Sequence, residues 1–299
     1  MPTAPLPVRD GLNPTRLRLP GGGAWPTVLA YLLDRFPADA DRLREKVAAG
    51  EVVTGTGDRV TPDTTYRAHS FVYLYRDPPV EPRVPFEIEI LHRDDDLLVV
   101  DKPHFLSSTP RGRHVVESAL VRLRRDLGLP DLTPAHRLDR VTAGVLVFTL
   151  RPEVRRAYQE LFADRRVRKE YEAIAPFAPA LDLPRTVRSR IVKPAGELRC
   201  VEVPGEPNAE TRIELIENRG TLARYRLLPH TGKMHQLRVH LNALGIPIVG
   251  DNFYPTLYDV APDDYSNPLQ LLARAVSFTD PLSGRPRTFT SLRRLSLPT

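Results

Sequence analysis

The chain has 299 residues, of which 41% are hydrophobic, enough for a sizeable globular core. Its 43 lysines and arginines outnumber 37 aspartates and glutamates, and the formal net charge of +6 favours a polyanionic partner such as nucleic acid. The single cysteine excludes an internal disulfide, and no apolar stretch approaches the roughly 20 residues that cross a bilayer. The proline-rich N-terminus also lacks the apolar core of an export signal, so we expect a soluble, cytoplasmic protein.

The first part of the chain predicts a small unit over residues 16–77, after a flexible lead-in over residues 1–15. Apolar residues recur with helical spacing after Trp25-Pro26, and a charged helix is expected to end at Gly50. The patterns predict, in order, helices over residues 27–36 and 41–49 and strands over residues 52–53 and 71–75. We expect a linker over residues 78–86, because its prolines continue neither a helix nor a central strand.

The remaining residues, 87–299, are expected to form one larger domain. In chain order the patterns predict a hairpin over residues 88–100, a helix over 116–127, a strand over 145–150, a helix over 152–164, strands over 171–175, 187–192, 209–216 and 222–228, and a helix over 234–244. Strands and helices do not alternate regularly, so the pattern indicates an α+β fold and not a βαβ winding.

One segment of this domain, residues 136–144, places an aspartate between two arginines. Asp139 lies in a loop just before a predicted buried strand, where catalytic groups are often held by a rigid scaffold. Guanidinium groups at Arg137 and Arg140 would keep its carboxylate ionised and nucleophilic. The residues alone favour an ordinary solvated ion pair, or a loop cap made by Asp139, over a catalytic role.

A second segment, residues 231–241, carries a histidine and an arginine on one predicted helical face. His235 and Arg238 are three residues apart, so Arg238 is placed to pair with a carboxylate in a cleft. A zinc site is disfavoured, because His235 and His240 are five residues apart, about 140° around a helix. We interpret His235 as a hydrogen-bonded structural residue.

A third segment, residues 168–173, begins a predicted strand with a tyrosine beside a cation. Tyr171, next to Lys169, is suited to stack on a base or to handle a proton. An ordinary strand aromatic remains the alternative.

Together, the three segments resemble the motifs of the RluA-type pseudouridine synthase family, which modifies uridines in large ribosomal and transfer RNA. Residues 136–144 resemble the nucleophile motif, residues 169–171 the second motif and residues 231–251 the third, and residues 97–103 resemble the lead-in strand with its Lys-Pro. The resemblance runs from about residue 85 to the end. Departures from the family pattern stand at His104-Phe105, Ala143 and Lys233-Met234 and concern substrate fit.

The resemblance implies a catalytic domain with a mixed, largely antiparallel sheet and a central cleft, acting on RNA without cofactor or metal. A uridine would be flipped out of its helix, and its base would detach, rotate and reattach through carbon 5. Asp139 would be the nucleophile or the base that starts the reaction, and Arg238 would pair with it. Tyr171 would contact the uracil and is a candidate for the final proton abstraction. The expected substrate-binding residues are His136, Arg137, Arg140 and Lys169, with Arg137 filling the space left by the flipped base.

The small unit is similar, more weakly, to the small α/β RNA-binding domain shared by a ribosomal protein and many RNA enzymes. Its acids offset its bases, which fits a degenerate copy. Arginine-rich residues 111–125 and 151–170 are candidates for phosphate contacts. We expect a bacterial monomer that processes ribosomal or transfer RNA and binds neither DNA nor a membrane.

Two other classes of function stay open at this point. The departures from the family pattern fit an RNA-binding factor that has lost catalysis. A carbohydrate-active hydrolase is less favoured, because such enzymes need two acids flanking the bond and the motifs offer no second acid beside Asp139. Neither the RNA that is modified nor the atom attacked by Asp139, on sugar or on uracil, follows from the sequence.

Overall fold

The computed structural model describes residues 4–297, which divide between Pro79 and Val80 into two compact units. Each unit buries its own hydrophobic core. No helix among the described residues is long and apolar enough to span a bilayer.

The small unit consists of two helices and a three-stranded antiparallel sheet in the order β1-β3-β2. The elements are β1 (Thr15–Arg18), α1 (Val28–Arg35), the 3-10 turn η1 (Pro37–Asp39), α2 (Ala40–Ala48), β2 (Val52–Thr54) and β3 (Phe71–Leu74). Thr27 starts α1, because its hydroxyl accepts a hydrogen bond from the Ala30 amide at 3.1 Å. The sequence predicts both helices, β2 and β3. It misses the short turn η1 and β1, which is too short to show a clear alternation.

The large unit is built on one sheet of eleven strands, counted over the described residues. Nine follow the order β10-β9-β11-β12-β8-β13-β7-β5-β4, while β14 pairs with β13 and β6 with β7. The strands are β4 (Glu89–Arg93), β5 (Leu97–Lys102), β6 (Thr133–Pro134), β7 (Ala143–Thr149), β8 (Arg168–Pro176), β9 (Arg185–Val192), β10 (Val201–Val203), β11 (Ala209–Arg219), β12 (Leu222–Pro229), β13 (Leu271–Thr279) and β14 (Pro286–Thr290). Every pairing is antiparallel except that of β13 with β7, so the sheet is mixed and mostly antiparallel as expected.

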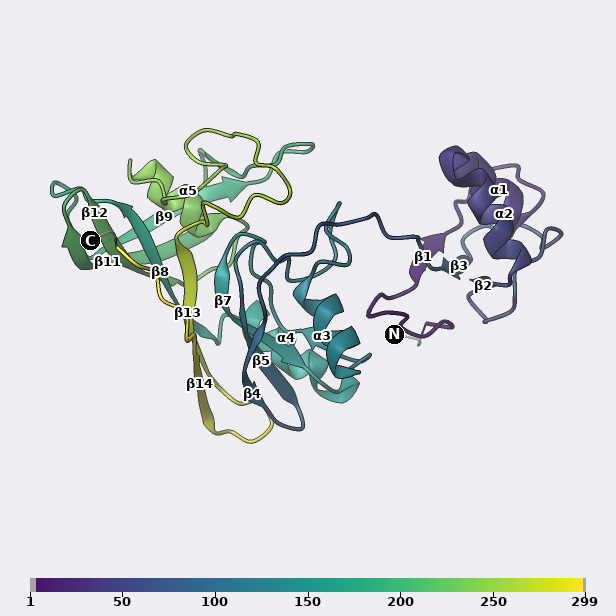
Figure 1. Cartoon of the computed structure of the whole chain (residues 1–299), viewed down its shortest axis with the longest axis horizontal. Helices are drawn as coiled ribbons and strands as arrows, with labels where there is room; N and C mark the ends of the chain where they lie inside the picture. Colours follow the sequence, from purple (N-terminus) through teal and green to yellow (C-terminus); the bar gives the residue numbers. More distant parts are fainter. Residues whose placement is uncertain (1–3, 298–299) are drawn as a thin grey trace. The chain divides into compact units, whose positions relative to one another are not determined.

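Helices cover the sheet at three places (Figure 1): α3 (Ala119–Leu127), α4 (Arg155–Ala163, after the 3-10 turn η2, Pro152–Val154) and α5 (Gln236–Ala243). Alternate residues of β5 belong to different cores, Leu98 with Leu120 of α3 and Leu97 with Tyr158 of α4. Side chains of a strand alternate between faces, so α3 and α4 bury opposite faces of β5 and β7. This explains why both strands read as continuous apolar runs. Helix α5 packs on β8, β11 and β12.

Strand β13 is the main element that the sequence does not predict, although it lies in the middle of the sheet between β8 and β7. Its register with β8 shifts between Ala273 and Ala275, which marks a β-bulge. An extra residue breaks the two-residue alternation that reveals a strand. The carboxyl-terminal part of the fold was therefore hidden from pattern analysis.

Candidate active site

The loop that carries Asp139 lies between β6 and β7. The Thr142 amide donates to the Asp139 carbonyl at 3.1 Å, which closes a turn just before β7. The Asp139 side chain keeps 29% of its surface exposed, so its carboxylate is open to a ligand.

Gly144, at the start of β7, lets β13 come close to this turn. β13 runs parallel to β7 there, with Ala273 in register with Gly144. The φ angle of Gly144 is +113°, and a Cβ at this position would lie 2.2 Å from the Ala273 carbonyl oxygen. Only glycine fits both constraints. Because Ala273 also pairs with Tyr171 of β8, the sheet itself brings Tyr171 beside the Asp139 turn.

Two side chains fix the backbone on either side of Asp139. Lys102, fully buried at the end of β5, donates its three protons to the carbonyls of Pro103 (2.9 Å), Leu106 (2.7 Å) and Arg140 (3.2 Å). The Ser108 hydroxyl donates to the Leu138 carbonyl at 2.8 Å and accepts from the Leu138 amide at 3.0 Å. Residues 138 and 140 are thus both tied to the end of β5 and the segment after it, which stands out in the sequence by its Lys-Pro and by His104-Phe105.

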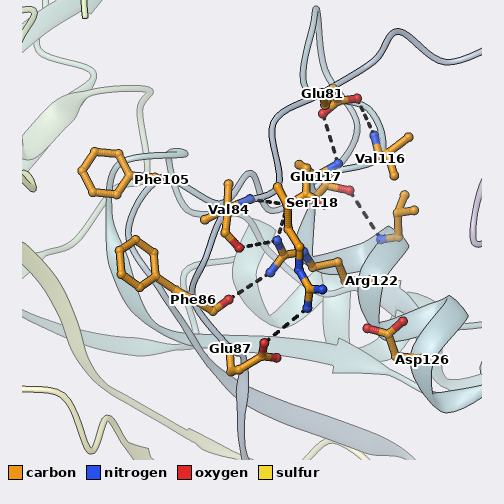
Figure 2. Close-up of polar contacts among 12 residues, drawn as sticks. Glu81, Val84, Phe86, Glu87, Phe105, Val116, Glu117, Ser118, Arg122 and Asp126 are labelled. Atoms are coloured by element: carbon orange, nitrogen blue, oxygen red, sulfur yellow. Dashed lines mark hydrogen bonds and ion pairs between the residues drawn. The ribbon is translucent and has the colours of Figure 1, made fainter. Parts of the chain in front are cut away.

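That segment is in turn bound to residues 81–86, which the sequence analysis assigned to the linker. Glu81 accepts hydrogen bonds from three successive amides, those of residues 115, 116 and 117. Figure 2 shows the two from Val116 and Glu117. Buried Arg122 pairs with Glu117 and donates to the carbonyls of Val84 and Phe86. We call this set, Glu81, Val84, Phe86, Glu117 and Arg122, the linker clamp. The clamp makes the end of the linker part of the support beneath the Asp139 loop.

Arg238, on α5, is the cation nearest to Asp139. Its Nη1 atom lies 3.6 Å from Asp139 Oδ2, while its Nε and Nη2 atoms bind both oxygens of Asp251 at 2.8 and 2.6 Å. Its guanidinium also lies over the rings of Phe253 and Tyr254. Burial disfavours the charge, but the hydrogen bonds and charge of Asp251, together with Asp139, raise the pKa of Arg238 above its ordinary value. Arg238 is therefore a fixed positive charge beside the Asp139 carboxylate.

Asp251 is a site residue to which the sequence analysis gave no role. In the sequence, Asp251 is marked only as part of the Gly250-Asp251 pair that ends the third motif. The structure shows why it is needed, because a fork of two hydrogen bonds orients the guanidinium plane. Amides of Phe253 and Tyr254 hold the Asp251 carboxylate in turn, at 2.8 and 3.2 Å.

Tyr171 and His235 are the other ionisable groups at the site. Burial, and to a smaller extent the charge of Asp139, raise the pKa of the Tyr171 phenol, so it keeps its proton at neutral pH. His235 places Nε2 3.9 Å from Asp139 Oδ2 and Nδ1 3.1 Å from the Tyr254 hydroxyl. It adopts a left-handed backbone, with φ of +56°, where non-glycine residues are uncommon. The hydrogen bond expected of His235 is present, but the ring also faces Asp139.

The remaining expected site residues make their contacts elsewhere. His136 stacks on Phe162 at 4.3 Å and accepts from the Val147 amide at 3.2 Å, and burial lowers its pKa to about 3. Arg140 donates to the Phe105 carbonyl at 3.3 Å, and Lys169 to the Thr231 carbonyl at 3.1 Å. Neither Arg137 nor Arg140 forms an ion pair with Asp139 among the described residues; Arg238 takes that place. Substrate binding by these four residues stays a prediction.

The arginine-rich segments are less available for RNA than the sequence suggests. On α3, Arg122 and Arg124 are buried, and Arg124 donates to the Leu132 carbonyl. On and around α4, most arginines are paired with acids. Within residues 4–297, the side chains of Arg165 and Arg168 show no hydrogen bond or ion pair, and both residues are exposed. Arg165 borders a pocket of about 150 Å³ together with Arg188 and His230, at the end of β12.

Known proteins are similar to this chain in sequence and in fold. Residues 96–243 match the family model described as RNA pseudouridylate synthase. The dual-specificity RNA pseudouridine synthase RluA of Escherichia coli strain K12 is 36% identical over 222 residues, covering 71% of this chain and 94% of the relative. The chain belongs to the RluA-type family of RNA pseudouridine synthases. RluA of Haemophilus influenzae is 32% identical over 234 residues, covering 72% and 95%. As a member of this family the chain is an RNA-modifying isomerase, as the motifs implied.

Solved structures give the same assignment for the large unit. Human RNA pseudouridylate synthase domain containing 4 superposes with a TM-score of 0.53 and 27% identity, covering 70% of this chain and 88% of that one. Human RNA pseudouridylate synthase domain containing 1 gives a TM-score of 0.58 at 24% identity and supports the fold alone. The pseudouridine synthase fold therefore accounts for the mixed sheet.

Proposed function

We propose that this enzyme isomerises specific uridines in structured RNA, ribosomal or transfer, with Asp139 as its catalytic nucleophile or base. The observation that carries the proposal is the pairing of Asp139, partly exposed, with Arg238, which is buried and locked by Asp251. A fixed cation keeps a carboxylate ionised and oriented, as a nucleophile requires.

The reaction exchanges a nitrogen–carbon for a carbon–carbon glycosidic bond within one nucleotide, so atoms are neither gained nor lost. Asp139 would attack or deprotonate the nucleotide, and Arg238 would hold its carboxylate. Tyr171, with its proton retained, would donate a hydrogen bond to the uracil. The target base would be flipped from its stack at a cost of a few kcal/mol. Exposed Arg137, beside Asp139, is free to fill the space it leaves.

RNA affinity is proposed to come mainly from phosphate contacts around the site. Arg165, Arg168 and the pocket shared by Arg165 and Arg188 support this, because exposed cations gather there. We propose that the small unit, with two helices on a short sheet, contributes a further RNA contact. The bacterial relatives support a bacterial enzyme, which we propose to act as a cytoplasmic monomer.

The test is Asp139→Asn, which keeps the shape of the side chain and removes its charge. The reacting RNA is ribosomal and transfer RNA from cells that lack the gene, and pseudouridine is mapped after incubation. We expect a rate loss of about 10⁴-fold or more with RNA affinity nearly unchanged. Asp126→Asn, an exposed acid on α3, is the matched control and should keep full activity. Substantial activity in Asp139→Asn would rule out the proposed mechanism, and no product with the unchanged enzyme would rule out the function.

A further inference from the structure

The hydrogen bonds around Tyr254 fix the proton on His235. The Tyr254 hydroxyl donates its one proton to the Cys200 carbonyl at 2.8 Å and accepts from the Cys200 amide at 2.9 Å. Its remaining acceptor position faces His235 Nδ1 at 3.1 Å, so Nδ1 must be the donor. A neutral His235 therefore carries its proton on Nδ1 and has a free lone pair on Nε2.

The free nitrogen of His235 faces Asp139 without bonding to it. The distance of 3.9 Å between Nε2 and Asp139 Oδ2 is too long for a direct hydrogen bond. Within residues 4–297, no other hydrogen-bond partner is found for Nε2. The side chain keeps 9% of its surface exposed, beside the more open Asp139. Nε2 is thus an unengaged acceptor next to the reacting carboxylate.

We propose that His235 is a second catalytic residue, whose Nε2 removes the proton from carbon 5 once the uracil has reattached through that carbon. The inference rests on the proposed function and changes the assignment of its last chemical step. The final proton abstraction, expected of Tyr171 from the sequence, passes to the histidine. Tyr171 keeps the role of a hydrogen-bond donor to the base.

The proton balance of this step is complete. After the bond between carbon 5 and the sugar forms, carbon 5 still carries its hydrogen. That proton moves to Nε2, and the electron pair of the carbon–hydrogen bond restores the double bond between carbons 5 and 6. Nitrogen 1, released from the sugar, ends with one proton, so the product is an isomer of the substrate. The imidazolium then returns its extra proton to the nitrogen or to water.

The other groups at the site are poorly suited to accept this proton. Arg238 carries a fixed charge, and Lys102 uses all three protons on backbone carbonyls. The Tyr171 phenol is protonated at neutral pH for the reason given above. Asp139 is the remaining candidate to accept the proton, because it would already be in contact with the nucleotide from the earlier step. The experiment must therefore separate His235 from Asp139.

The surroundings of His235 keep it neutral in the working enzyme. Burial lowers its pKa below the ordinary value of 6.5, Asp139 and Asp251 oppose this shift, and Arg238 and Lys193 support it. Phe253 and Tyr254 complete the contacts of the ring. A base of this kind is active above its pKa and loses activity as the pH falls through it.

The experiment is His235→Gln with RNA carrying either hydrogen or deuterium at carbon 5 of the target uridine. We expect the single-turnover rate to fall by on the order of 10²-fold or more. Because loss of the base slows proton removal, the ratio of hydrogen to deuterium rates should rise above that of the unchanged enzyme. Tyr171→Phe should also be slower but leave this ratio unchanged. The matched control is His92→Gln, which changes a histidine on the edge strand β4 that hydrogen-bonds to Asp94. This variant should keep both the rate and the isotope ratio.

Two results would overturn the proposal: an undiminished rate, or a lower rate without a larger isotope ratio. The second would mean that His235 only holds Asp139 for an earlier step.

A Tyr254→Phe variant removes the hydroxyl that fixes the Nδ1 proton and should share the larger isotope ratio. RNA affinity of each variant, measured at the same salt concentration, shows that the site has folded. Failure of the unchanged enzyme to form pseudouridine would instead count against the proposed function.

Discussion

Asp251 shows how much of this site depends on a residue that acts through Arg238. It receives two hydrogen bonds from Arg238, and both side chains are almost completely buried. The orientation of the Arg238 charge, and through it that of Asp139, depends on this pair.

We predict that Asp251→Asn lowers kcat far more than it raises KM, because the fork that aims Arg238 toward Asp139 is lost. Removing one member of a buried ion pair also typically costs about 3–5 kcal/mol of unfolding free energy. Urea unfolding and steady-state kinetics measure the two effects. Asp96→Asn, which breaks the surface pair with Arg151, should cost no more than about 1 kcal/mol and spare activity. A variant at Asp251 with unchanged kcat would show that Arg238 needs no partner.

At this scale the sequence placed Asp139, Tyr171 and Arg238 on segments that the structure brings together. It could not place His235 and Asp251, because their contacts depend on tertiary structure. The ring of His235 faces Asp139 only through a left-handed backbone at the start of α5. A spacing argument assumes helical geometry and cannot anticipate that turn.

At the scale of elements, the linker clamp joins the end of the linker to the segment that supports Asp139. Glu117 and Arg122 are buried. Ser108, which bonds to the backbone of Leu138, lies on the same loop as Glu117, between β5 and α3. The arginine-rich face of α3 is therefore structural in part, although the sequence made it a candidate for phosphate contacts.

We predict that Arg122→Met destabilises the large unit by about 3–5 kcal/mol, because Glu117 is left buried and unpaired. The free energy of unfolding in urea measures this loss. Arg125→Met, three residues further along the same helix, changes an exposed side chain and should alter stability by no more than about 0.5 kcal/mol. Equal stability of the two variants would show that the linker clamp does not stabilise the large unit.

Most elements were predictable because their apolar periodicity is regular. α3, α4 and α5 show helical spacing, and β5 and β7 show continuous apolar runs. Strand β13 carries Arg274 in its middle and a bulge beside it, so neither rule applies. Its position is set by pairing with β8 and β7, which lie about 100 or more residues earlier in the chain, and a local pattern cannot reveal such pairing.

At the scale of the whole molecule, burial lowers the pKa of several histidines and so couples stability to pH, and His104, His136 and His240 show the largest shifts. Burial lowers the pKa of His104 to about 4, of His136 to about 3 and of His240 to about 4. The unfolded chain takes up these protons near pH 6.5, before the folded protein does. The stability that these groups contribute is therefore complete above pH 6.5 and is lost as the pH falls toward 4.

We predict that the unfolding free energy decreases steadily from pH 6.5 to pH 4, by at most about 1.4 kcal/mol per pH unit for each histidine. Urea unfolding at half-unit steps measures the slope. His240→Asn removes one of the three groups and should flatten the curve over this interval. Carboxylates with lowered pKa values, such as Asp77 at about 2, act only at lower pH. A flat curve between pH 6.5 and 5 would contradict the prediction.

The position of β13 has a consequence for how the protein is made. The strand that joins β7 to β8 is synthesised roughly a hundred residues after both of them, since it begins at Leu271. A nascent chain that has not reached it holds two separate halves of a sheet, with Asp139 on one half and Arg238 on the other. Among the strands of this sheet only β14 is synthesised after β13. Asp139 and Arg238 therefore come together only after β13 has paired with both halves of the sheet.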